Sequence, residues 1–114
     1  MPKLPNAEQA YVEQSKLDGY LLDPDHRVGA PKLRFLESFG FSRAEPEKVC
    51  AALIAHGGAH EASVISTRFG VKYEVDGPLL TPTGEAPWVR TIWLIGDGDA
   101  RPRLISMKPL RKRP

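Results

Sequence analysis

The sequence has a single cysteine, Cys50, so an intrachain disulfide cannot form and a disulfide-stapled secreted scaffold is excluded. Cys50 lies in the apolar stretch VCAALIAH, which favours the role of a small buried hydrophobic residue over that of a reactive thiol. The first residues contain no apolar signal-like region, and no run approaches the roughly 20 apolar residues of a membrane span. These absences predict a cytoplasmic protein with no membrane partner.

Familiar site motifs are missing as well. Three histidines are present, His26, His56 and His60, and they show no zinc-like spacing with one another or with Cys50. No glycine-rich phosphate loop, calcium-loop ligand series or GxSxG element occurs. We therefore expect no metal and no other cofactor, so any chemistry must come from the side chains of the chain itself.

The composition is that of an ordinary globular protein, with 41% hydrophobic and 26% charged residues. A length of 114 residues predicts a single domain over 1–114, with an extended lead-in over 1–14 and a basic tail over 109–114. Eleven prolines and ten glycines predict many tight turns. The net charge of +2 is compatible with nucleic-acid contact and does not require it.

The hydrophobic periodicity changes near Gly58, and this change predicts an α+β fold. Helical signals precede it: a short helix from an N-capping Ser15 to Pro24, a helix from Pro31 to Gly40, and a helix over EPEKVCAALIAHGG (45–58). Strand signals follow it at 62–68, 71–76, 89–95 and 104–108, and a further short strand is expected at 10–12. Because short connections favour antiparallel neighbours, we expect N-terminal helices packed on a C-terminal four-stranded antiparallel sheet.

The stretch from Tyr20 to Leu36 is the first candidate for chemistry. The compact turn at 23–25 displays His26, a residue type suited to proton transfer. Lys32 and Arg34 follow, and such cations can hold a phosphate or stabilise a developing oxyanion. The plainer alternatives are a histidine that is solvated or caps a helix, and two cations on a solvated helix face.

The strand at 89–95 is the second candidate. Its alternation places Trp88, Arg90, Ile92 and Leu94 on one face and Val89, Thr91, Trp93 and Ile95 on the other. Arg90 is unusual among apolar neighbours, because a buried charge without a partner is costly. It is expected either to pair with Glu74 or to bind phosphate, with Arg103 or Ser106 of the last strand nearby. Both faces carry apolar residues, so the pattern does not determine which face the helices cover.

Four segments of the chain, together spanning roughly residues 4–107, resemble a small bacterial domain family of unknown function. They read LPNAEQAYV, KLDGYLLDPDHRVGAPKLRFLESFGF, FGVKYEVDGPLLTPTGE and VRTIWLIGDGDARPRLIS. The family pattern has LPN, a K-L-x-x-Y-L-L-N-P-x-H-P-x-G-K-x-K core, and a sheet ending in V-R-x-x-W and P-R-L-V. Members of that family occur alone and as terminal modules of polymorphic toxins and phage-head proteins. This layout and context distantly resemble the barnase–EndoU–colicin–RelE group of RNase toxins.

The resemblance can be carried over residue by residue. The pattern's histidine, second lysine, two arginines and tryptophan fall on His26, Lys32, Arg90, Arg103 and Trp93. Two positions depart from the pattern: Ala30 stands where the first lysine is usual, and Arg27 where proline is usual. If that lysine is essential, the resemblance implies a weakened or inactive member of the family.

The resemblance implies a toxin-type, metal-free ribonuclease that acts by attack of a 2′-hydroxyl on the adjacent phosphate. RNA is then the substrate, and a small antitoxin or immunity protein encoded beside it is the expected partner. In this scheme His26 is a general acid or base, and Lys32 and Arg90 stabilise charge on the phosphorane. The residues expected to orient the substrate are Arg34, Thr91, Arg103 and Ser106. The alternatives are a noncatalytic module that docks a protein or nucleic acid through the loop at 26–34, and a purely structural adaptor.

Overall fold

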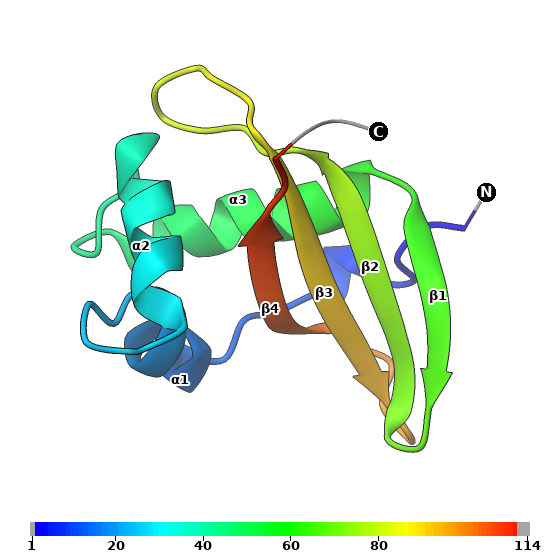
Figure 1. Cartoon of the computed structure of the whole chain (residues 1–114). Helices are drawn as coiled ribbons and strands as arrows, with labels where there is room; N and C mark the ends of the chain where they lie inside the picture. The colour runs from blue at the N-terminus through cyan, green and yellow to red at the C-terminus, as the bar shows by residue number, and fades with distance from the viewer. Residues whose placement is uncertain (1, 112–114) are drawn as a thin grey trace.

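The computed structural model describes residues 2–111, so the end of the expected basic tail, Lys112 to Pro114, lies outside the described residues (Figure 1). Its helical elements are the 3-10 turn η1 (Ala7–Gln9), α1 (Gln14–Lys16), the π-helix η2 (Leu17–Leu21), α2 (Gly29–Ser38) and α3 (Pro46–Ala59). Its strands are β1 (Ala62–Thr67), β2 (Gly70–Pro78), β3 (Trp88–Gly96) and β4 (Arg103–Pro109). The strands pair antiparallel in the order β1-β2-β3-β4. The predicted α+β arrangement of N-terminal helices and a four-stranded antiparallel sheet is confirmed.

The ends of the helices follow their capping residues. Pro46 opens α3 as the sequence predicts, and Gly40 follows α2 with a φ of 94°, a left-handed conformation that glycine adopts without strain. Ser15, expected as an N-cap, lies inside α1 instead, because the cap position belongs to Glu13. The expected strand at 10–12 is reduced to one bridge between Tyr11 and Arg103.

Helix α3 packs across one face of the sheet, while α1 and α2 lie beyond the edge formed by β4 (Figure 1). The approach of α3 is close because Gly57 has no side chain; a Cβ there would lie 2.7 Å from the ring of Trp93. Buried residues of η2, α2, α3 and all four strands join in one hydrophobic cluster. Within the described part of the chain, no helix is both long enough and apolar enough to cross a bilayer.

Helix α3 does not cover the opposite face of the sheet, which we call the open face. Val89, Thr91 and Trp93 of β3 are buried on the side of α3, so the alternating residues of the strand face the other way. The strand register then places polar residues of three strands together on the open face: Lys72, Glu74, Asp76, Arg90, Ser106 and Lys108. This open face, which the sequence alone did not select, is where a candidate site can form.

Candidate functional site

One polar cluster lies where η2, α2 and β4 meet, and we call it the lysine cluster: Tyr20, Lys32 and Ser106. The ammonium of Lys32 donates hydrogen bonds to the Tyr20 hydroxyl and, over 3.1 Å, to Ser106 Oγ. The two hydroxyl oxygens are themselves hydrogen-bonded at 3.0 Å. Among residues 2–111, Lys32 has no carboxylate within 4.0 Å, so its charge is not neutralised by an ion pair.

The local sequence explains how this cluster forms. A Cβ on Gly29 would lie 1.8 Å from the carbonyl oxygen of Tyr20, so only glycine lets the first turn of α2 pack on η2. Lys32 follows three residues later on the same side of the helix, which brings its side chain over Tyr20. Ser106 reaches the pair from the open face of β4.

The electrostatics of the lysine cluster favour ionisation of the phenol. Burial by itself raises the pKa of Tyr20, but the hydrogen bonds from Lys32 and Ser106 and the charges of Lys32 and Lys16 lower it by more. The net pKa of Tyr20 is therefore below its ordinary value of 10.0. At a given pH, more of a phenol held against an ammonium in this way is ionised than of a free tyrosine, so more phenolate is available to accept a proton.

His26 lies beside this cluster and caps α2. Its Nδ1 accepts the backbone N–H groups of Val28 and Gly29, both at 3.0 Å. Because a backbone N–H can only donate, Nδ1 carries no proton and a neutral ring carries its proton on Nε2. The ring of His26 meets the Tyr20 ring edge-on, with 5.1 Å between centroids. The capping alternative is thus what the structure displays, and it explains why α2 begins at Gly29 rather than at Pro31.

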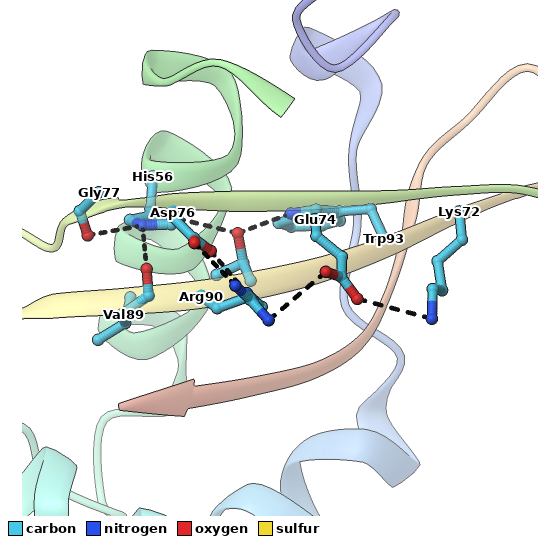
Figure 2. Close-up of polar contacts among 9 residues, drawn as sticks. His56, Lys72, Glu74, Asp76, Gly77, Val89, Arg90 and Trp93 are labelled. Carbon is cyan, nitrogen blue, oxygen red and sulfur yellow. Dashed lines mark hydrogen bonds and ion pairs between the residues drawn. The ribbon is translucent and has the colours of Figure 1, made fainter. Parts of the chain in front are cut away.

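Arg90 belongs to a second group on the open face, an ion-pair row with Asp76, Glu74 and Lys72 (Figure 2). Its Nε and Nη2 donate to the two oxygens of Asp76 at 2.7 and 2.9 Å, and its Nη1 lies 3.5 Å from Glu74. Lys72 completes the row at 3.6 Å from Glu74. The expected pairing with Glu74 is confirmed, but Asp76 is the closer partner, and hydrogen bonding from Arg90 is the main reason that the pKa of Asp76 is lowered.

The two groups are neighbours on the sheet. Arg90 is paired with Lys108 across β3 and β4, and Ser106 lies two residues from Lys108 on the same face. Such diagonal positions in an antiparallel pair are about 7–8 Å apart. The structure therefore brings Lys32, Ser106 and Arg90 to one face, with His26 at its margin.

Thr91 lies on the other face, fully buried beneath α3. Its hydroxyl accepts the Trp93 indole N–H at 2.9 Å and donates to His56 Nδ1 at 2.9 Å. His56 Nε2–H in turn lies 3.0 and 3.1 Å from the carbonyl oxygens of Gly77 and Val89, so both ring nitrogens are hydrogen-bonded (Figure 2). Burial is the chief cause that lowers the pKa of His56. Because Thr91 is enclosed in this chain, it cannot reach a substrate on the open face.

The two remaining arginines lie apart from the lysine cluster. Arg34 is on the exposed side of α2, with no ion pair to any described carboxylate. Arg103 opens β4 and pairs with Glu13 at 3.2 Å. Neither contacts Lys32, so their expected part in orienting a substrate stays a prediction.

Three residues of these networks were not identified from the sequence. Tyr20 lies in the Y-L-L part of the core motif. The feature of the sequence that could have identified it is a polar phenol hydroxyl beside two leucines. Asp76 and His56 gave weaker signals, because the partner of the first depends on strand register and that of the second on how its helix packs on the sheet. Across residues 2–111, no three His, Cys, Asp or Glu side chains gather in a way that could hold a metal ion.

Comparison with known proteins gives a fold relative and a family. The fold is similar to a chain of a solved "Contact-dependent growth inhibition toxin - immunity protein complex from Klebsiella pneumoniae 342", with a TM-score of 0.62 and 13% identity over 89% of this chain and 100% of that chain. At this identity the likeness shows the fold alone. No curated protein matches the chain. The family described as Domain of unknown function (DUF6883) matches residues 3–111, so the chain belongs to this family.

Proposed function

We propose that the chain is an endoribonuclease of a bacterial toxin system, with the lysine cluster as its reaction centre. The observation that carries the proposal is the state of Lys32: a cation with no carboxylate partner among residues 2–111, bonded to two hydroxyl groups at an open sheet face. Positive charge available in this way suits the negative charge that develops on a phosphate under attack. The chain shares its fold with a chain of a toxin–immunity complex, and this likeness also supports a role in a toxin system.

The reaction follows from the groups present. The Tyr20 phenolate takes the proton of the RNA 2′-hydroxyl, and the 2′-oxygen forms a bond to the adjacent phosphorus. Lys32 stabilises the charge of the phosphorane. The bond from phosphorus to the 5′-oxygen then breaks, and that oxygen takes a proton from solvent water, while His26 Nε2–H, the donor of its tautomer, hydrogen-bonds to it as it leaves. The products are a 2′,3′-cyclic phosphate and a free 5′-hydroxyl.

The other basic residues have lesser parts. Asp76 holds two nitrogens of Arg90, so Arg90 contributes to the potential of the face and reaches a phosphate only if that carboxylate is displaced. Arg34 and Arg103 lie farther out, where they can contact the RNA backbone on either side. Ala30 is buried at 8% exposure, so Lys32 is the cation that α2 supplies to this cluster.

The partner that we propose is an acidic protein that covers the open face. A carboxylate of such an inhibitor would bind Lys32 where the phosphate binds and would cost less desolvation than at Arg90, which already has carboxylate partners. An inhibitor encoded beside the toxin gene is expected to block cleavage and to bind the Lys32→Ala variant more weakly.

The test is cleavage of total RNA or tRNA by the purified protein in the presence of EDTA. Wild type is expected to cleave, Lys32→Ala to lose about 100- to 1,000-fold in rate, and His26→Ala to lose less. Lys48→Ala is the matched control, since Lys48 is an exposed lysine of α3 paired with Glu45. RNA left intact by wild type, or cut equally well by Lys32→Ala, would contradict the proposal.

A noncatalytic binding module is the second candidate, and the contacts of Arg90 and of His26 Nδ1 favour it. The Arg90 guanidinium and His26 Nδ1 already make hydrogen bonds inside the protein, as structural residues do. In that case the free protein cleaves no RNA, and a partner is retained through the face that includes Lys32. A stable partner together with intact RNA would select this function over the first.

A further inference from the structure

The two edges of the sheet are protected very differently. At β4 the outer side is covered: Tyr11 bonds to Pro102 and Leu104, α2 packs against the strand, and the strand itself carries Arg103, Lys108 and Pro109. At β1, the edge farthest from α1 and α2, the bonds from described residues are at its start, where Lys3 bridges Glu61 and Pro2 accepts the N–H of Ala62 (Figure 1). The strand has the sequence ASVIST, with no charge and no proline. Such an edge is a template for another strand.

The backbone groups available at this edge can be identified. The Ala62 N–H points away from β2, since it bonds to Pro2. Outward and inward groups alternate along an antiparallel strand, so the N–H and C=O groups of Val64 and Ser66 point outward as well. The ladder to β2 uses neither residue's backbone groups. Val64 and Ile65 are also 49% and 40% exposed, so they can provide apolar contact at this edge.

We infer that β1 is the edge through which two copies of this chain pair, forming one continuous eight-stranded sheet. A two-fold axis at Ile65 sets Ile65 opposite its copy, Val64 opposite Ser66 and Ser63 opposite Thr67. Val64 and Ser66 then exchange their outward hydrogen bonds in both directions. The axis runs perpendicular to the sheet, so both α3 helices lie on one side and both open faces on the other.

The absence of charge on β1 indicates that the strand pairing with this edge is a second copy of β1. At a two-fold axis the central residue faces its own copy, so a charge there would meet the same charge. An uncharged strand with an isoleucine at its centre avoids this repulsion, whereas an edge adapted to a charged partner strand would carry the opposite charge. The other three strands each carry charges on the open face, and β1 carries none.

The test is sedimentation equilibrium of the full chain over a wide concentration range, where wild type is expected to dimerise. Ile65→Lys is expected to weaken the dimer roughly 100-fold by losing apolar contact and opposing two ammonium groups. Ser66→Pro removes an outward N–H that the monomer does not use and is expected to weaken the dimer roughly 30-fold, whereas Ser66→Ala keeps that N–H and the dimer. Circular dichroism checks that each variant is folded.

A charge-swap experiment makes the test specific for self-pairing. Ile65→Lys and Ile65→Glu are each expected to be monomeric, and their mixture to form a heterodimer, because a lysine then faces a glutamate on the axis. A wild type that is monomeric at all concentrations would overturn the inference. So would a dimer that survives both Ile65→Lys and Ser66→Pro, because it would use another surface.

Discussion

Two polar networks lie on the two sides of the same strands, and they are built on opposite principles. Under α3, the chain from Trp93 through Thr91 to His56 is buried, and each donor has an acceptor. On the open face, Lys32 places its positive charge against Tyr20 and Ser106, with no carboxylate of the described residues beside it. The inner network is buried and neutral, whereas the lysine cluster carries a positive charge that can bind an anionic ligand.

Because of this difference, the residues that stabilise the fold and those proposed for function lie on opposite faces of the same sheet. A buried network is costly to break, because each group that loses its partner keeps its desolvation penalty. Lys32 and Tyr20 are half-buried and still within reach of water, so their hydrogen bonds contribute less to folding than those of the buried network. Changes to the inner network should therefore reduce stability, and changes to the lysine cluster should reduce activity at nearly constant stability.

The largest effect is expected for Tyr20→Phe, which keeps the ring and removes the hydroxyl that we assign as the base. RNA cleavage should fall about 100- to 1,000-fold. In wild type the rate should rise with pH as the phenol ionises, up to a pKa below 10.0, and in the variant this rise should vanish. Initial rates on tRNA across a pH series measure both. An unchanged pH profile would remove Tyr20 from the reaction.

His56→Ala is the matching change to the inner network. It leaves a cavity and deprives Thr91 and the carbonyls of Gly77 and Val89 of a partner, so unfolding should become easier by about 2–4 kcal/mol. Urea unfolding followed by circular dichroism measures the loss. His60→Ala is the control: His60 is only partly buried and makes one bond, to Pro78, so its loss should be clearly smaller. Equal losses of stability in the two variants would show that the inner network contributes no more to folding than the single hydrogen bond of His60.

Much of this fold could be predicted from the sequence. The helix over 45–58 and the strand at 89–95 are close to their observed bounds, because Pro46 and strict alternation are local signals. What local signals lack is the choice of sheet face. Thr91 was expected to orient a substrate, yet it is buried, because Gly57 lets α3 approach the face that carries Trp93.

The site was only partly predictable for the same reason. Lys32 and Ser106 were named, but the residue that joins them, Tyr20, has the appearance of a core aromatic in the sequence. Asp76 was missed as the partner of Arg90, because β2 extends beyond its expected end at 76 to Pro78 and the register places 76 opposite 90. Register and helix packing are long-range properties, and they decide which polar residues meet.

A smaller effect is the pH dependence of stability. The folded pKa of His56 is lowered, chiefly by burial, so between that pKa and the ordinary value of 6.5 the unfolded chain binds more protons. Stability should be full above pH 6.5 and fall as the pH drops below it, by at most about 1.4 kcal/mol per pH unit from this group. Unfolding in urea at several pH values measures the slope, and His56→Leu should reduce it. A slope unchanged in that variant would assign the effect to other groups.

The smallest effect on stability, about 0.2–1 kcal/mol, is expected for Asp76→Asn, which keeps the shape of the side chain and removes the charge that holds Arg90. With Arg90 released, the open face gains a second available cation, and RNA should bind several-fold more tightly with a steeper dependence on salt. Titration of labelled RNA at several salt concentrations measures both, and Glu74→Gln is the control with the longer contact of 3.5 Å. If neither variant changed the affinity for RNA, the electrostatic potential of the open face would not contribute to RNA binding. The contrast between the two sides of the sheet would then concern stability alone.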